Sequence, residues 1–143
     1  VKPLIEDSNI KVSNLMAKLK SQNEHEDPNE VKVVVDKNNF ALYFSREPIP
    51  SRKIYSKEIL AYKQVCIIPF TRDSLLDYSN LDATPLEIIE SVDMNRFLEN
   101  GIKVKMVPTT YQTYAVDTLQ DLTLVEEFMT NDILLNQYIY NSK

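Results

Sequence analysis

The chain has 143 residues, 43% of them hydrophobic and 26% charged, which suits one domain with its own core. Its net charge of −5 argues against a nucleic-acid binder or an anionic-membrane binder, because such proteins concentrate lysine and arginine. The single glycine, Gly101, excludes a glycine-rich phosphate loop, and the single cysteine, Cys66, excludes an intramolecular disulfide. Without a long apolar run, the simplest expectation is a soluble protein of the cytoplasm that neither crosses nor binds a membrane.

The N-terminal third predicts a helix, a loop and two strands. We expect a helix capped by Asp7 and Ser8 whose apolar face is formed by Ile10, Leu15, Met16 and Leu19. The polar run 21–30 predicts a loop. The segments 31–36 and 40–45 are short and rich in β-branched and aromatic residues, and they predict strands joined by a turn at 37–39.

The remainder of the chain alternates between strand and helix signals. The nearly continuous apolar run 63–70 predicts a strand buried on both faces, with Cys66 as a small core residue. Helices are expected at 72–79, at 85–100 before Gly101, and from the capping pair Thr118 and Asp121 to about Thr130; strands are expected at 103–107 and 113–117. This alternation indicates an α/β fold. The tail 131–143 is either a last helical turn or an arm onto a partner.

Two carboxylates stand out on the predicted helix 85–100. At a helical spacing, Glu90 and Asp93 fall inside the arc formed by the apolar residues. Burial of an unpaired carboxylate is costly, which leaves two interpretations. Either the helix is partly exposed or each acid pairs with a neighbour such as Arg96 or Arg72, or else the acids face a cavity that holds a polar ligand.

Three further polar residues are considered as site candidates. Asp117 ends a predicted strand, where a carboxylate can hold Mg²⁺ against substrate phosphates or simply favour the following helix N-terminus. Arg46 follows a strand, so its guanidinium either binds a carboxylate or phosphate or pairs with Glu47 or another surface acid. His25 is the only histidine and lies in an acidic loop, so we expect a surface residue and no histidine-rich metal site.

Several segments, in order, resemble the CMP-Kdo synthetases, the cytidylyltransferases that activate 3-deoxy-manno-octulosonate (Kdo). The resemblance is densest in residues 27–36 (DPNEVKVVVD) and 41–50 (ALYFSREPIP). Further matches follow at 63–70, 85–96, 98–101, 116–118 and 121–122. The resemblance implies a nucleotide-diphosphosugar-transferase-like α/β domain with a mixed sheet, incomplete here, over residues 1–130, followed by the tail 131–143.

This resemblance also implies an activity. Family members transfer CMP from CTP to the anomeric hydroxyl of the sugar acid and release pyrophosphate with the help of Mg²⁺, for bacterial lipopolysaccharide or capsule synthesis. It implies that Asp117 binds the metal, that a homodimer forms in the cytoplasm, and that the sugar is contacted by Ser45, Arg46, Gln64, Asp93 and Met94.

The chain departs from the family pattern in ways that matter for function. Family members usually have His where Gln64 stands, Gln where Met94 stands and commonly Glu where Asp93 stands, so we expect the substrate to be Kdo or a close 3-deoxy-2-keto acid modified at its distal carbons. The nucleotide-binding loop and a further metal aspartate of the family precede the segment matched by residues 1–5. The chain therefore resembles the C-terminal half only, and we expect it to be inactive alone. A non-catalytic binding protein that reuses the half-fold, and a cytidylyltransferase for another acidic sugar such as a nonulosonate, are the alternatives.

Overall fold

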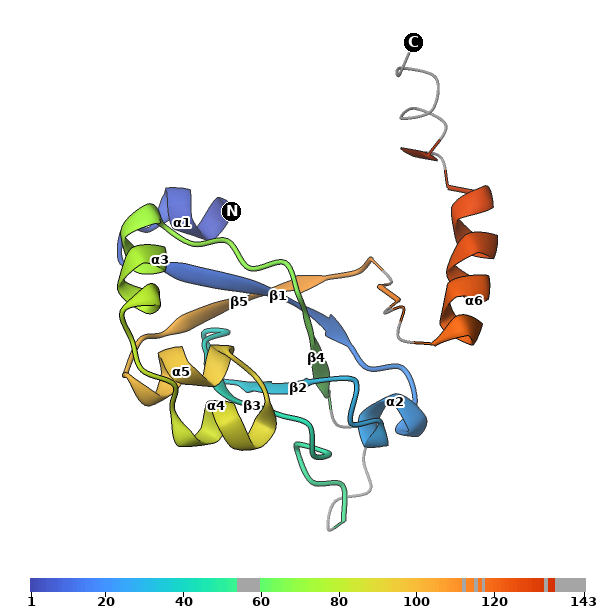
Figure 1. The fold of residues 1–143 in the computed structure, drawn as a ribbon, viewed down its shortest axis with the longest axis horizontal. Helices are drawn as coiled ribbons and strands as arrows, with labels where there is room; N and C mark the ends of the chain where they lie inside the picture. Colours follow the sequence, from blue (N-terminus) through green and yellow to red (C-terminus); the bar gives the residue numbers. More distant parts are fainter. Residues whose placement is uncertain (54–59, 112, 115, 117, 133, 136–143) are drawn as a thin grey trace. The chain divides into compact units, whose positions relative to one another are not determined.

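A computed structural model describes residues 1–53, 60–111, 113–114, 116, 118–132 and 134–135. The chain forms two compact units, Val1–Tyr111 and Gln112–Lys143. The first unit contains a five-stranded sheet in the order β3-β2-β4-β1-β5 (Figure 1). Its strands are β1 (Val12–Lys18), β2 (Lys32–Val35), β3 (Ala41–Ser45), β4 (Tyr62–Val65) and β5 (Val104–Thr109).

The sheet is mixed, which confirms the predicted α/β class. β1 is parallel to β5 and antiparallel to β4, and β2 is antiparallel to both β3 and β4. The predicted hairpin of β2 and β3 is present, and Asn39 in its turn has a φ of 59°, a backbone conformation that asparagine tolerates. The carbonyl of Asn39 also accepts a hydrogen bond of 2.8 Å from the N–H of Met106, so the turn contacts β5.

The expected helix over residues 10–19 is wrong, because this segment forms the strand β1. Only a short helix, α1 (Lys2–Glu6), precedes it. Both faces of β1 are covered: Val12 and Met16 are buried on one face, and Ser13 and Ala17 on the other. A strand buried on both faces lacks apolar–polar alternation, so its apolar spacing resembled that of a helix.

The predicted strand 63–70 ends early, at Val65. In the register against β1, Leu15 lies opposite Val65, whereas Val12 is bridged to Phe70. The segment between Val65 and Phe70 is therefore longer than the β1 segment that it accompanies, and its extra residues project outward. Cys66 is exposed as a result, and its predicted place in the core is wrong.

The helices of the first unit are short. The predicted loop 21–30 contains α2 (Gln22–Glu26), and α3 (Arg72–Ser79) matches its predicted bounds. The single helix predicted at 85–100 is wrong: α4 (Pro85–Glu90) and α5 (Met94–Glu99) are separated at Ser91, which has a left-handed φ of 52°. Gly101 follows α5 with a φ of 72°, as its predicted C-terminal capping position requires.

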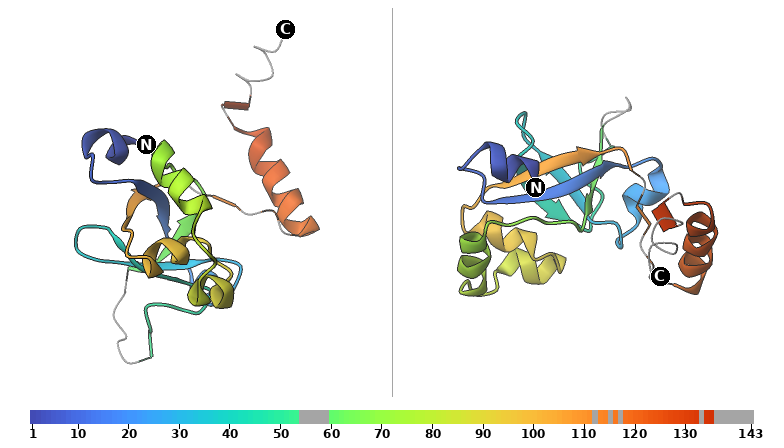
Figure 2. Two further views of the ribbon diagram at one scale, coloured as in Figure 1. Left: turned by 60° about the vertical axis from the view of Figure 1, so that its left-hand side comes forward. Right: turned by 90° about the horizontal axis from the view of Figure 1, so that it is seen from above.

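Helices α3, α4 and α5 cover one face of the sheet (Figure 2). Phe97 of α5 is fully buried and its ring stacks on that of Tyr78, with 4.6 Å between the centroids. The edge strand β3 is held to α5 by Asn95, whose amide oxygen accepts from the N–H of Phe44 and whose amide nitrogen donates to its carbonyl. The core consists of Val12, Met16, Val33, Ala41, Phe44, Val92, Met94, Phe97, Val104 and Met106.

The second unit contains α6 (Leu119–Thr130). Its predicted capping pair is confirmed, because the N–H of Thr118 donates to the Asp121 carboxylate at 2.8 Å and the N–H of Asp121 donates to the Thr118 hydroxyl at 3.2 Å. The strand predicted at 113–117 and the tail 131–143 lie partly outside the described residues. No helix within the described part of the chain is long and apolar enough to cross a membrane.

Candidate functional site

The C-terminal end of β3 meets the C-terminal end of α4, and Glu90 joins them. One carboxylate oxygen of Glu90 accepts hydrogen bonds from the Tyr43 hydroxyl (2.7 Å) and the Ser45 hydroxyl (2.8 Å). The other accepts from the backbone N–H of Arg46 at 2.8 Å. A single carboxylate from α4 therefore binds three groups at the end of the strand, two side-chain hydroxyls and one backbone N–H.

These contacts determine the protonation of the cluster. Burial alone would raise the pKa of Glu90, but the hydrogen bonds from Arg46, Tyr43 and Ser45 and the positive charge of Arg46 hold it below its ordinary value. Burial and the hydrogen bond to Glu90 raise the pKa of Tyr43 to about 12. Glu90 is thus an anion and Tyr43 a neutral donor at neutral pH.

The Arg46 side chain is held by backbone carbonyls. Its Nε–H donates to the Glu90 carbonyl at 2.8 Å, Nη1 donates to the Pro28 carbonyl at 2.8 Å, and Nη2 donates to the Ser91 carbonyl at 3.3 Å. A guanidinium has five N–H donors, so two remain beyond these contacts within the described part of the chain. The guanidinium therefore contacts backbone carbonyls, and Glu47 is not among its partners. Its binding of a carboxylate or phosphate stays a prediction.

Lys32 lies beneath this strand end and was not singled out by its sequence. Its side chain is fully buried, and its Nζ donates to the carbonyls of Asp27 (2.7 Å) and Arg46 (2.5 Å). Burial lowers the pKa of Lys32, although the negative charges of Asp27, Glu30 and Glu47 oppose this shift. The run of valines around Lys32, at positions 31 and 33–35, gave no sign that this lysine points inward.

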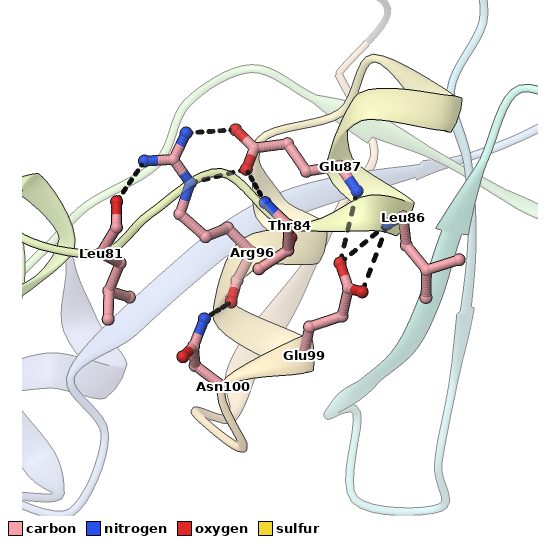
Figure 3. A network of polar contacts seen from close by, with 7 residues as sticks. All are labelled: Leu81, Thr84, Leu86, Glu87, Arg96, Glu99 and Asn100. Carbon is pink, nitrogen blue, oxygen red and sulfur yellow. Dashed lines mark hydrogen bonds and ion pairs between the residues drawn. The ribbon is translucent and has the colours of Figure 1, made fainter.

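A second polar network joins α4 to α5 (Figure 3). Arg96 binds Glu87 through two hydrogen bonds, from Nε at 2.6 Å and from Nη2 at 2.5 Å, and its Nη1 donates to the Leu81 carbonyl. The hydrogen bonds from Arg96 lower the pKa of Glu87. Glu99 accepts from the N–H of Leu86 at the start of α4. Arg96 thus pairs with Glu87, and not with the two acids that the helical pattern had indicated.

Asp93 is exposed and lies at a surface pocket of about 380 Å³. Ser91, whose carbonyl receives Arg46, lines the same pocket. The other lining residues are Ala83, Glu87, Ile88 and Val92. Ser91 therefore links Arg46, and Ser45 beside it, to the pocket at which Asp93 lies.

The other predicted sugar contacts have different surroundings. Met94 is only 1% exposed and belongs to the core, whereas Gln64 is half-buried on β4 opposite Met16. Asp117, the predicted metal ligand, lies outside the described residues. Among the residues that the structure does describe, no group of three or more His, Cys, Asp or Glu side chains is arranged to hold a metal ion. The sugar and metal roles of these residues stay predictions.

The expectation of a surface histidine is wrong. His25 is 2% exposed, and its Nε2 lies 3.1 Å from the carbonyl of Ile49. The reason is that the polar run around it folds into α2, which Ser21 caps by accepting from the N–H of Glu24 at 3.1 Å. One side of this short helix then faces the segment that follows β3, and His25 ties the two together.

Comparisons with known proteins agree on one family. A family model described as Cytidylyltransferase matches residues 2–105. The 3-deoxy-manno-octulosonate cytidylyltransferase of Geotalea uraniireducens is 38% identical over 137 residues, which cover 89% of this chain and 55% of the relative. That of Fusobacterium nucleatum is 42% identical over 125 residues, which cover 87% of this chain and 50% of the relative.

A solved structure agrees with these relatives. CMP:2-keto-3-deoxy-manno-octonic acid synthetase complexed with CTP matches 90% of this chain and 53% of its own, with a TM-score of 0.83 and 32% identity. The chain therefore spans about half the length of the relatives that it matches. Its sequence and its mixed five-stranded sheet both place it in the same group, and the chain belongs to the cytidylyltransferase family.

Proposed function

We propose that the chain is the C-terminal, sugar-binding and dimer-forming part of a cytidylyltransferase that acts on Kdo or a closely related 3-deoxy-2-keto sugar acid. The proposal is supported by the printed activities of the relatives and by the similarity over most of the chain. The observation that carries it is Arg46, a guanidinium fixed at a strand end with donors left for a planar anion.

In this proposal Arg46 binds the carboxylate of the sugar acid. The exposed Asp93 carboxylate accepts hydrogen bonds from the sugar hydroxyls, and the Gln64 amide can accept from them or donate to them. Ser45 donates to Glu90 and accepts from the N–H of Glu47 at 2.9 Å, so it shapes the strand end beside Arg46. Met94 packs beneath the site from the core. The absence of the family's usual His and Gln at positions 64 and 94 favours a sugar modified at its distal carbons.

The proposed reaction is a nucleotidyl transfer. The anomeric hydroxyl oxygen of the sugar attacks the α-phosphorus of CTP, the bond to the bridging oxygen breaks, and pyrophosphate leaves with that electron pair. Mg²⁺ would neutralise charge on the triphosphate, and Asp117 is the residue that we propose to hold it. The chain's own contribution is to bind and orient the sugar acid so that its hydroxyl faces the nucleotide. We assign the product to bacterial lipopolysaccharide or capsule synthesis in the cytoplasm.

Pyrophosphate release tests the proposal. This chain and the same protein extended to its native N-terminus are each incubated with CTP, Mg²⁺ and Kdo, and with a panel of modified 3-deoxy-2-keto acids and nonulosonates. We expect turnover by the extended protein only, with a modified acid preferred to Kdo. Turnover of a nonulosonate alone would replace the substrate assignment, and no turnover by either protein would support a binding protein that reuses the fold.

A further inference from the structure

Both backbone polar groups of Arg46 are held by charged side chains. Its N–H donates to the Glu90 carboxylate at 2.8 Å, and its carbonyl accepts from the buried Lys32 ammonium at 2.5 Å. The side chain then turns back so that its Nε–H reaches the backbone carbonyl of the same Glu90, also at 2.8 Å. Glu90 therefore binds Arg46 twice, once through its carboxylate and once through its carbonyl.

Glu90 is itself held in place, because α4 is fixed at both ends. At the start of α4, Glu99 accepts from the N–H groups of Leu86 and Glu87, and Arg96 binds the Glu87 carboxylate (Figure 3). At the end of α4, the Glu90 carboxylate accepts hydrogen bonds from the hydroxyls of Tyr43 and Ser45 in β3, in addition to that from Arg46. A helix of six residues that is fixed at both ends has little freedom to shift. The position of Glu90 is therefore fixed, and its hydrogen bonds fix the position of Arg46.

We infer that Glu90 is a positioning residue, which sets the place and direction of the Arg46 guanidinium for the sugar-acid carboxylate. This inference rests on the proposed function, because it assigns Arg46 a ligand. Its physical basis is preorganisation: an arginine already immobilised by its peptide and its Nε loses less side-chain freedom when it binds an anion. The Glu90 charge also offsets one of the two cations, Arg46 and Lys32, that lie at this strand end.

The central variant is Glu90→Gln. The amide oxygen of glutamine can still accept from the hydroxyls of Tyr43 and Ser45, but its NH₂ group then faces the Arg46 N–H, where two donors meet. The matched control is Glu6→Gln, which makes the same chemical change at an exposed ion pair with Lys2 in α1, outside the network that positions α4 and Arg46. Steady-state kinetics on the catalytically competent protein should show KM for the sugar acid raised roughly tenfold to a hundredfold by Glu90→Gln, with KM for CTP unchanged.

A double-mutant cycle separates positioning from a general structural effect. Arg46→Ala should raise KM for the sugar acid, and in that background Glu90→Gln should have almost no further effect. If Glu90→Gln leaves KM for the sugar acid unchanged while Arg46→Ala raises it, the inference is overturned and the proposed function stands. If Arg46→Ala has no effect on that KM, the assigned ligand of Arg46 and the inference both fall.

A measurement without substrate tests the same arrangement. It can be made even if the Glu90 variant does not fold or the protein turns over no sugar. In the ¹⁵N NMR spectrum of the wild-type chain, the Nε–H of Arg46 should exchange with water at least tenfold more slowly than that of Arg72, whose side chain is 83% exposed. Glu90→Gln should remove this protection and Glu6→Gln should preserve it. Equal exchange of the two arginines in the wild type would overturn the inference, whatever the enzyme assay shows.

Discussion

Two buried asparagines predict opposite effects on stability when each is replaced by leucine. Asn14 and Asn95 are 0% and 1% exposed. The Asn95 amide pairs with both backbone groups of Phe44, at 3.0 and 3.3 Å. Neither amide atom of Asn14 has a hydrogen-bond partner among the described residues, although it lies on β1 between Val12 and Met16 of the core.

The magnitudes follow from this difference in pairing. A buried polar group without a partner costs roughly 1–3 kcal/mol, so Asn14→Leu, which keeps the branch at Cγ and replaces both polar atoms by larger methyl groups, should raise the free energy of unfolding by up to about that amount. Asn95→Leu should lower it by roughly 1–3 kcal/mol for each of the two Phe44 groups left unpaired. With an m-value of about 2 kcal/mol/M, the urea midpoints should move in opposite directions, by about 1 M for Asn14→Leu.

The assay is urea unfolding of the chain followed by circular dichroism, with the m-value fitted for each variant. A change in midpoint at constant m reports stability, whereas a change in m would indicate an altered denatured or native state. If Asn14→Leu lowers the midpoint as Asn95→Leu does, the Asn14 amide makes a stabilising interaction and the reasoning from its missing partner is refuted.

Three further predictions concern pH, thiol reactivity and backbone conformation. The hydrogen bonds from Arg96 place the pKa of Glu87 below its unfolded value, so their stabilisation is present above pH 4.5 and lost as pH falls through the lowered pKa; Glu87→Gln should flatten the acid limb of stability measured against pH. Although Cys66 is exposed, the protein around it partly desolvates the thiol and, with the negative charge of Asp93, raises its pKa, so iodoacetamide should alkylate it at pH 8 more slowly in the folded than in the urea-unfolded chain; equal rates would contradict this. A Cβ at Gly101 meets nothing within 4 Å, so Gly101→Ala should cost only the roughly 1–2 kcal/mol of a left-handed backbone, measured by thermal unfolding, and a larger loss would indicate a hidden contact.

Local signals predicted the parts of the fold that local interactions determine. The hairpin of β2 and β3, the helix α3 and the capping pair Thr118 and Asp121 each depend on residues close in sequence, and all three are present. The strand β1 was missed because both of its faces are buried, and that burial depends on parts of the chain that are distant in sequence. The break at Ser91 was missed for a related reason, since a non-glycine residue with a left-handed φ carries no reliable sequence signal.

The candidate site divides in the same way. Arg46 was recognisable as a cation at a strand end, and Glu90 as a carboxylate on a face expected to be buried. Their pairing was not predictable, because Glu90 binds residues that lie 44 to 47 positions earlier in the chain. His25 was misjudged and Lys32 was not singled out, because lysine and histidine are usually exposed and only the backbone carbonyls that approach them explain their burial.

The surroundings of Arg46 indicate what controls its position. Its guanidinium contacts the carbonyls of Pro28, Glu90 and Ser91, so it is located by backbone groups that the loop before β2 and the end of α4 hold in place. A substitution that shifts α4 will therefore displace the guanidinium even when the substituted residue has no contact with Arg46. Under the proposed function, the α4–α5 network of Glu87, Arg96 and Glu99 therefore contributes to sugar discrimination as well as to stability.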